Sequence, residues 1–217
     1  MENWKEIGVK RYNRINVIGC SGSGKTTFSR QLSVLLGIPY VELDGVFWEP
    51  NWTTPEDEVF YPRLKKALEP DFWVLDGNYS RTVPIKWEKV QAVIWLDYSF
   101  ARTIFRSVKR ATTRAITKEE LWPGTGNRES FRKGFFSKDS IILWAIKNHA
   151  KIRRRYEALD VNGAYQHIDF IRIASPQEAE AYLRALAGSV VKDSERTPTG
   201  SATHIENEEQ IGAAADH

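Results

Sequence analysis

The chain has 217 residues, of which 41% are hydrophobic and 27% are charged. These values fit one globular domain of ordinary size and exclude a largely disordered chain. The longest apolar runs, such as residues 141–146, are far shorter than the roughly 20 residues of a membrane-spanning helix, and the first residues contain no apolar export segment. A single cysteine, Cys20, excludes an internal disulfide. We therefore expect a cytoplasmic protein without membrane contact; composition leaves the oligomeric state open.

The formal net charge of +3 is unevenly distributed. Residues 188–217 carry two basic and six acidic side chains, so the rest of the chain carries +7. Two basic stretches contain no acids: Arg102, Arg106, Lys109, Arg110 and Arg114, and Lys147, Lys151, Arg153, Arg154 and Arg155. Either stretch suits a polyanion, and the alternative is a solvated helix face. A nucleoside triphosphate needs the same cations as a nucleic acid, so charge alone does not separate these two partners.

Apolar runs of strand length alternate with segments of helical periodicity along the chain. Residues 1–13 are expected to form a flexible leader. Strands are predicted at residues 15–19, 40–44, 72–76, 92–97 and 166–173, and helices at residues 24–36, 54–68, 99–115, 140–156 and 175–187. The apolar pattern fails after residue 187, so residues 188–217 are expected to form a disordered acidic tail.

Fully apolar strands that alternate with helices are typical of buried parallel sheets. The pattern therefore predicts an α/β fold over residues 14–187, namely a three-layer α/β/α sandwich around a five-stranded parallel sheet. In such folds, ligands bind at the carboxyl ends of the strands.

A glycine-rich loop follows the first predicted strand and opens the first predicted helix. Its sequence from Gly19 to Thr26, G-C-S-G-S-G-K-T, satisfies the whole P-loop (Walker A) pattern. In this motif backbone N–H groups and the helix N-terminus bind phosphates, Lys25 reaches the β- and γ-phosphates, and the Thr26 hydroxyl ligates Mg²⁺. The residues expected to contact the nucleotide are Gly19, Ser21, Gly22, Ser23, Gly24, Lys25, Thr26 and Thr27. Cys20 is interpreted as a small filler; the alternative is a reactive thiol whose pKa the positive loop would lower.

Acidic residues end three of the predicted strands. Asp76 is the first candidate for orienting Mg²⁺ or its water shell, and Asp44 is the second candidate at the same edge of the sheet. The alternative is that each carboxylate caps the following turn. For Asp97 we expect only this capping role.

Arginines at a spacing of four residues line one face of the helix predicted at residues 99–115. Arg106, Arg110 and Arg114 could thus converge on a transferred phosphoryl group, to which a planar guanidinium donates paired hydrogen bonds. Arg128 and Arg132 lie in the polar segment that follows. They would reach the site only if this segment closed over it, and a solvated loop is the alternative.

Aromatic residues gather just beyond Asp44. Trp48 and Trp52 could stack on an acceptor ring, whereas packing in the core or in a lid is the alternative. The histidines show no pairing that indicates metal binding or a nucleophilic triad, so no catalytic histidine is assigned.

With these motifs placed, the chain resembles the adenylate-kinase-like branch of the P-loop small-molecule kinases, and most of all proteins labelled DNA topology modulation protein or adenylate kinase. The resemblance runs from about Arg14 to Ala187. Besides the P-loop it depends on V-E-L-D-G-V-F-W from Val41, W-V-L-D-G-N-Y-S-R from Trp73, V-I-W-L-D from Val93 and L-W-P-G-T-G-N-R-E from Leu121.

The resemblance implies roles for several residues. In adenylate kinases D-G-F-P-R follows the third strand, which is similar to D-G-N-Y-S-R from Asp76 and implies acceptor contacts for Asn78, Tyr79 and Arg81. Two arginines at the spacing of Arg106 and Arg110 lead into a helical lid, here at about residues 115–138, one over the adenine and one on the phosphates. In contrast, L-D-G from Leu43 is more similar to shikimate and gluconate kinases, in which the carboxylate positions or deprotonates a hydroxyl.

The sequence thus predicts an ATP- and Mg²⁺-dependent phosphotransferase that acts on a small molecule, with GTP as an alternative donor. The expected catalytic residues are Lys25, Asp44, Arg110 and Arg114, and the expected metal-binding residues are Thr26 and Asp76. Acceptor contacts are expected from Asp44, Trp48, Asn78, Tyr79, Arg81, Arg128 and Arg132. The acceptor is either a nucleoside monophosphate or a hydroxyl compound. The alternative functions are a nucleic-acid-associated NTP-binding protein and a nucleotide-regulated scaffold with weak hydrolysis.

Overall fold

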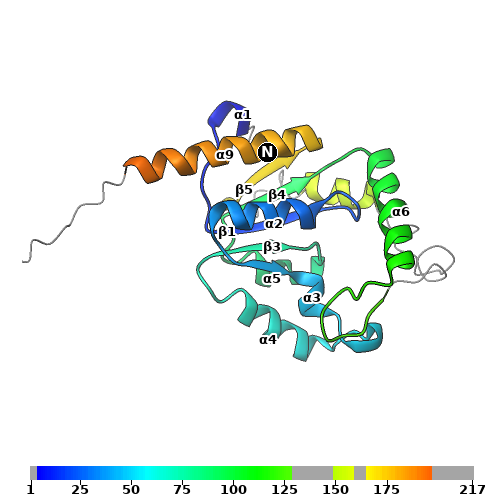
Figure 1. Cartoon of the computed structure of the whole chain (residues 1–217). Helices are drawn as coiled ribbons and strands as arrows, with labels where there is room; N and C mark the ends of the chain where they lie inside the picture. Colours follow the sequence, from blue (N-terminus) through cyan, green and yellow to red (C-terminus); the bar gives the residue numbers. More distant parts are fainter. Residues whose placement is uncertain (1–3, 129–148, 159–164, 197–217) are drawn as a thin grey trace, which may run out of the picture.

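The structure, a computed structural model, describes residues 4–128, 149–158 and 165–196. Its centre is a five-stranded parallel sheet in the order β2-β3-β1-β4-β5 (Figure 1). The strands are β1 (Arg14–Gly19), β2 (Tyr40–Glu42), β3 (Trp73–Asp76), β4 (Ala92–Leu96) and β5 (Asp169–Ile173). Central β1 pairs with β3 and β4, so that Val17 lies between Asp76 and Ile94. The predicted parallel sheet is confirmed.

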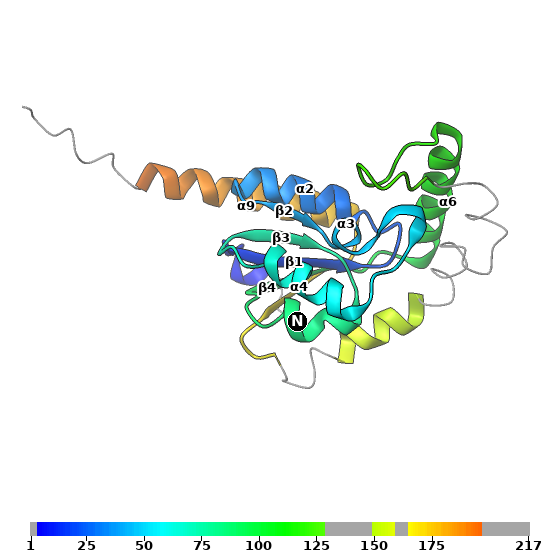
Figure 2. The same ribbon diagram turned by 90° about the horizontal axis from the view of Figure 1, so that it is seen from below.

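Helices cover both faces of this sheet and complete the predicted three layers (Figures 1 and 2). One face carries α2 (Lys25–Leu36) and α9 (Pro176–Arg196), and the other carries α4 (Asp57–Ala67), α5 (Val83–Lys86) and the helical residues 149–158. Alternate strand residues feed the two cores. Val17 packs in the cluster that includes Leu32 of α2, whereas Ile18 packs in the cluster that includes Phe60 of α4.

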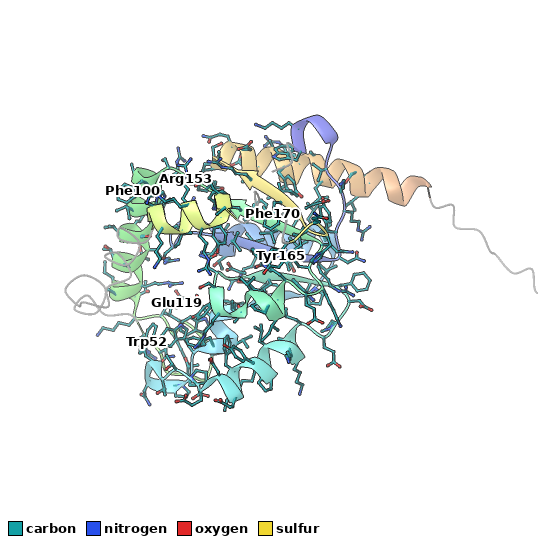
Figure 3. The ribbon with its side chains drawn as sticks, turned by 180° about the vertical axis from the view of Figure 1, so that it is seen from behind. Trp52, Phe100, Glu119, Arg153, Tyr165 and Phe170 are labelled. Atoms are coloured by element: carbon teal, nitrogen blue, oxygen red, sulfur yellow. The ribbon has the colours of Figure 1, made fainter. Side chains whose placement is uncertain are left out.

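Aromatic side chains fill much of the second core. The fully buried Trp87 ring contacts Tyr165 and Phe170 edge-on, at centroid distances of 5.1 and 5.6 Å. Figure 3 shows Tyr165 and Phe170 on this face, to the right of the helical segment that carries Arg153. These contacts attach the β5 edge of the sheet to the segment after β3.

The second predicted strand is shorter than expected. It ends at Glu42, and Leu43–Phe47 form the short helix α3, so Asp44 lies on a helix and the prediction that it ends a strand is wrong. The physical reason is that one helical turn buries both Leu43 and Phe47 in the same core. Two 3₁₀ turns, η1 (Pro50–Trp52) and η2 (Ser80–Thr82), flank α4 and α5.

Both ends of the described chain are more ordered than expected. In the predicted flexible leader, α1 (Trp4–Ile7) places the Trp4 ring edge-on against Tyr182 of α9 at 5.3 Å, with Trp4 only 8% exposed. At the other end, α9 continues to Arg196, into the predicted tail, and Val190 packs against the core there. The disordered tail predicted at residues 197–217 lies outside the described residues.

Helix α6 (Phe100–Thr117) stands at the carboxyl edge of the sheet and leads into the segment predicted as a helical lid (Figure 1). It ends at Thr117, the next residue Lys118 has a φ of 49°, and residues 118–128 form an irregular loop, so this described part of the predicted lid is not helical. Residues 129–148, with most of the predicted lid, lie outside the described part. In the described ranges, no helix is long and apolar enough to cross a membrane.

Candidate active site

The P-loop follows β1 and turns sharply into α2, as predicted. Gly22 and Gly24 have left-handed backbone conformations, with φ of 84° and 91°, which glycine adopts without strain. The first N–H groups of α2 have no acceptor within the helix and so can bind phosphate oxygens. The Lys25 amine donates to the Cys20 carbonyl at 3.3 Å. It therefore lies across the loop that would surround the phosphates.

Two predicted nucleotide-binding residues differ in their placement. The Ser23 side chain is completely buried, and its backbone N–H donates to the Cys20 carbonyl at 3.1 Å, so Ser23 stabilises the loop from inside. Thr27 is exposed on the first turn of α2.

Helix α6 packs directly on the P-loop. A Cβ atom on Gly22 would overlap the Thr103 carbonyl and the Ser107 hydroxyl, so only glycine permits this contact. The Ser107 hydroxyl donates to the Ser21 carbonyl at 3.0 Å, and Arg110 donates to the Ser21 hydroxyl at 2.6 Å. These bonds place the arginine face of α6 over the phosphate loop, as the spacing predicted.

The other two arginines of this face flank Arg110 by one helical turn. Arg106 lies over the start of α2, because a Cβ on Gly24 would come within 3.0 Å of its guanidinium. Arg114 is half-buried one turn after Arg110.

The two predicted metal-binding residues are in contact. The Thr26 hydroxyl donates to Asp76 Oδ2 at 2.6 Å, which leaves its lone pairs directed away, and Tyr40 donates to the same oxygen at 3.3 Å. The other oxygen, Oδ1, is buried without a hydrogen-bond partner in the described chain. A hydroxyl and an unpaired carboxylate oxygen beside a phosphate loop fit Mg²⁺. The described residues contain no cluster of three or more His, Cys, Asp or Glu side chains suited to a metal, so phosphates and water would supply the remaining ligands.

The turn after β3 connects the parts of the site. Asn78 accepts from the Gly19 N–H at 3.0 Å and donates to the Gly19 carbonyl, so it clamps the start of the P-loop. A Cβ on Gly77 would overlap the Leu43 side chain, which brings α3 against this turn. Tyr79 lies close enough to Asp44 for the two groups to shift each other's pKa. Of the two predicted acceptor contacts in this turn, Asn78 thus binds the backbone of the P-loop, whereas Tyr79 faces Asp44.

Asp44 lies within electrostatic range of the phosphate-binding cations. The residue is solvent-accessible on α3, yet surrounding protein atoms limit the hydration of its carboxylate, and this desolvation raises its pKa. The neighbouring Tyr79 phenol, Lys25 and Arg110 lower the pKa of Asp44. The site thus holds a carboxylate with elevated proton affinity beside the phosphate loop.

A second carboxylate near Asp44, that of Glu42, was not predicted. Partial burial raises its pKa, opposed by a hydrogen bond from Trp122 at 3.4 Å, while Asp76 and Asp44 add to the increase. Arg30 lies 3.6 Å from its other oxygen. In the sequence, the only signal for a role of Glu42 was its position at the end of a strand. Trp122 is 80 residues away, and nothing in the sequence indicated that it contacts Glu42.

Trp48 and Trp52 pack with Trp122 rather than standing open. Trp48 and Trp122 are nearly parallel, at 6.3 Å and 17°, and Trp52 meets both edge-on. The loop that carries Trp122 is fixed further by Asn127, which accepts from the Trp52 N–H at 2.8 Å and donates to the Glu49 carbonyl at 2.9 Å. Trp48 also lies near Tyr79 and lowers the pKa of its phenol. These three tryptophan rings therefore form one wall beside Asp44 and Glu42.

Among the described residues, two arginines predicted at the acceptor, Arg81 and Arg128, make other contacts. Arg81 pairs with Asp57 at 2.9 Å and lies over the rings of Phe47 and Phe60, at 5.2 and 5.3 Å. The Arg128 side chain is exposed, and its backbone forms an isolated antiparallel β-bridge with Glu120. Arg132 lies outside the described residues.

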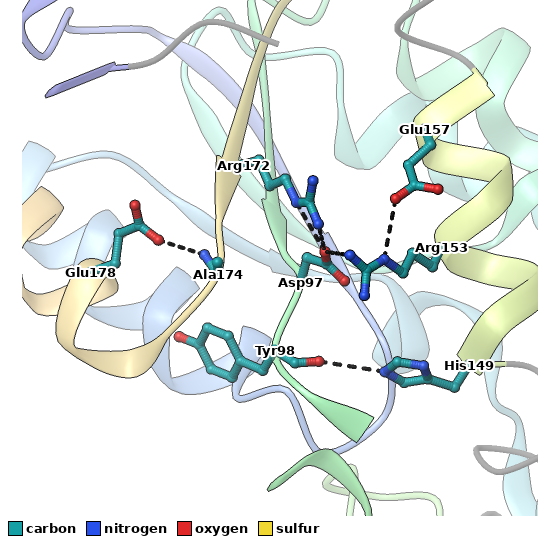
Figure 4. Close-up of polar contacts among 8 residues, drawn as sticks. All are labelled: Asp97, Tyr98, His149, Arg153, Glu157, Arg172, Ala174 and Glu178. Atoms are coloured by element: carbon teal, nitrogen blue, oxygen red, sulfur yellow. Dashed lines mark hydrogen bonds and ion pairs between the residues drawn. The ribbon is translucent and has the colours of Figure 1, made fainter. Parts of the chain in front are cut away.

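Asp97 does more than cap a turn, which was its expected role. Arg172 of β5 donates to it through Nε at 2.9 Å and through Nη2, and Arg153 of the segment 149–158 lies 3.6 Å away (Figure 4). His149 contacts the Tyr98 carbonyl at 3.4 Å. These contacts attach the helical segment 149–158 to the end of β4.

Cys20 agrees with its interpretation as a filler. It is 6% exposed, and burial raises the pKa of its thiol despite the opposing effect of Lys25. The reactive-thiol alternative required a lowered pKa, so the structure contradicts it.

No protein-family model matches the chain, and no curated protein matches its sequence. Among solved structures, a gluconokinase from Sinorhizobium meliloti 1021 is similar with 18% identity and a TM-score of 0.43, over 85% of this chain and 99% of that chain. A shikimate kinase from Acinetobacter baumannii in complex with shikimate is similar with 18% identity and a TM-score of 0.49, over 85% of this chain and 93% of that chain. By its own topology, the chain is an α/β/α sandwich with a parallel five-stranded sheet and a P-loop at the carboxyl end of the central strand.

Proposed function

We propose that this protein transfers the γ-phosphoryl group of ATP, with Mg²⁺, to a hydroxyl group of a small molecule. The observation that carries the proposal is the position of Asp44, a carboxylate of raised pKa within electrostatic range of Lys25 and Arg110. Adenine as the base of the donor is taken from the resemblance of the sequence to adenylate-kinase-like proteins.

The donor side is supported by three groups that suit a triphosphate. The P-loop offers backbone N–H groups and Lys25, and Arg110 reaches Ser21 from α6. Thr26 and Asp76 would hold Mg²⁺, which neutralises charge on the β- and γ-phosphates when bound. Arg106 and Arg114 would add positive charge on the same face of α6.

The acceptor side favours a hydroxyl over a phosphate. The groups around Asp44 are the carboxylates of Glu42 and Asp76, the Tyr79 phenol and the tryptophan wall. A phosphate acceptor needs cations there, yet the predicted one, Arg81, is paired with Asp57. Apart from Arg30, which contacts Glu42, and the phosphate-binding Lys25 and Arg110, the described groups on the acceptor side are acidic or aromatic, which suits an uncharged or cationic hydroxyl compound.

In the proposed step, the acceptor oxygen attacks the γ-phosphorus as the bond from this phosphorus to the β–γ bridging oxygen breaks. The proton of the hydroxyl passes to Asp44, and ADP leaves with the bridging oxygen. The Tyr79 phenol beside Asp44 would orient its carboxylate. Lys25 and Arg110 stabilise the charge on the transferred group.

The experiment that tests the proposal is a transfer screen with γ-labelled ATP and Mg²⁺. Sugars, polyols, amino alcohols, sugar acids, nucleosides and nucleoside monophosphates are offered as acceptors, and Lys25→Ala serves as the inactive control. We expect a labelled hydroxyl compound that is absent with Lys25→Ala. Transfer to nucleoside monophosphates alone would contradict the hydroxyl assignment, and repetition with GTP tests the donor base.

A second candidate function is binding to nucleic acid. Arg102 and Lys109 on α6, and Lys151, Arg154 and Arg155 on the segment 149–158, are exposed. Neutralisation of several phosphates would give an affinity that falls steeply with salt. A log–log slope of several for duplex or single-stranded DNA would support this candidate, whereas the absence of binding even at low salt would count against it.

A further inference from the structure

Lys86 is a buried cation that the proposed reaction does not use. It ends α5 and is only 1% exposed, in the core between the sheet and the helical segment 149–158. No carboxylate in the described part of the chain pairs with it. A buried ammonium group without an ion-pair partner destabilises a fold, so its presence calls for a compensating role.

The polar contact of Lys86 is the backbone of the turn after β3. Its amine donates to the Gly77 carbonyl at 3.2 Å. The buried Asn16 of β1 donates to the same carbonyl at 3.2 Å and to the Leu75 carbonyl at 3.0 Å. Trp87 in turn donates to Asn16 at 2.9 Å. Two buried side chains, Lys86 and Asn16, thus donate to the same Gly77 carbonyl.

This carbonyl belongs to the turn that connects the candidate site. Asp76, directly before Gly77, accepts from Thr26; Asn78, directly after it, clamps Gly19. Tyr79, one residue further, interacts electrostatically with Asp44. A rotation of the Gly77 peptide would therefore displace the metal-binding acid, the P-loop and the acceptor acid together.

We propose that Lys86 is a positioning residue whose amine, from inside the core, fixes the Gly77 carbonyl and thereby the turn from Asp76 to Tyr79. The inference rests on the proposed function only in assigning a reaction to this turn. It predicts that removal of the amine loosens this turn without lowering the stability of the whole fold.

The charge environment of Lys86 supports a role as a hydrogen-bond donor rather than as a cation. Burial and the positive charges of Arg155 and Lys25 lower its pKa to about 7. The uncharged amine keeps N–H groups for Gly77, so the contact does not depend on the charge.

The experiment compares Lys86→Met with Lys89→Met, which removes an exposed lysine three residues along the chain. Methionine fills similar volume without a donor or a charge. For Lys86→Met we expect a melting temperature no lower than that of the wild type, faster deuterium uptake in peptides covering residues 73–82, and an about 10-fold higher Mg²⁺ requirement for ATP binding. Lys89→Met should match the wild type in all three.

Lys86→Gln restores an uncharged donor on a side chain one bond shorter, and we expect it to recover slow exchange and the Mg²⁺ requirement in part. Wild-type exchange and Mg²⁺ dependence in Lys86→Met would overturn the proposal, as would impairment in Lys86→Met that Lys86→Gln does not relieve. These measurements need no acceptor. If the wild type binds ATP but phosphorylates nothing, the proposed function fails while the exchange data still decide the role of Lys86.

Discussion

At the scale of single residues, the candidate site depends on groups whose protonation the fold changes. Desolvation raises the pKa of Asp44 and of Glu42, which lie near the metal-binding acid. A general base is most effective when its pKa approaches the working pH, so the raised value suits Asp44 for accepting a proton from a hydroxyl.

The first prediction concerns the pH dependence of transfer. Because the base must be ionised, kcat/KM should fall as pH decreases through the pKa of Asp44, with an inflection above the value of about 4 of an ordinary aspartate. The measurement is the pH profile of transfer for the acceptor found in the screen. An inflection that persists in Asp44→Asn would assign it to another group.

The second prediction concerns the pH dependence of stability. The pKa of Lys86 is about 7 in the folded protein and about 10.5 in the unfolded chain, so between these values the unfolded chain binds the extra proton. The free energy of unfolding contributed by this group therefore rises as pH increases from about 7, by up to about 1.4 kcal/mol per pH unit. Urea unfolding at pH 7 and 9 should show this rise in the wild type relative to Lys86→Met. A constant difference between the two proteins would mean that Lys86 keeps an ordinary pKa.

At the scale of elements, α6 and the P-loop act as one unit because Gly22 allows their backbones to meet. The spacing of Arg106, Arg110 and Arg114 predicted which face of α6 meets the P-loop. Sequence could not reveal that Thr103 and Ser107 touch the loop, because this contact joins segments about 80 residues apart.

The third prediction follows from this contact. Gly22→Ala would strain a backbone with φ of 84° and force α6 away from the loop, so we expect ATP affinity to fall at least about 10-fold. Gly188→Ala is the matched control, since an added Cβ at this position in α9 meets open space. It should leave ATP binding unchanged and stabilise the protein by about 0.5–1 kcal/mol. Equal ATP affinity in both variants would contradict the packing argument.

At the scale of the whole molecule, the sequence predicted the parts that local patterns determine. The parallel sheet follows from apolar runs, and the Thr26–Asp76 contact follows from a P-loop and an acid at strand ends. The turn of α3 was missed because a short run such as 43–47 satisfies helical and extended patterns alike. Trp122 and Lys86 were missed because their roles arise only from distant contacts.

The fourth prediction concerns the N-terminal segment, which was expected to be a flexible leader. Trp4 is 8% exposed and packs edge-on against Tyr182, so it contributes to the core beneath α9. Trp4→Ala should lower the free energy of unfolding by about 3 kcal/mol, measured by urea unfolding. The exposed Val34→Ala is the control and should cost less than about 0.5 kcal/mol. A Trp4→Ala cost as small as that of the control would show that this segment is not part of the core.

The central claim, that Asp44 accepts the proton of a hydroxyl acceptor, is tested most directly by the single-turnover transfer rate of Asp44→Asn with saturating ATP and Mg²⁺. Asparagine keeps the shape of the side chain and removes its basicity. We predict a rate at least about 100-fold below that of the wild type, with ATP affinity unchanged. A rate near that of the wild type would contradict the claim, as would a loss of ATP binding that accounts for the whole defect.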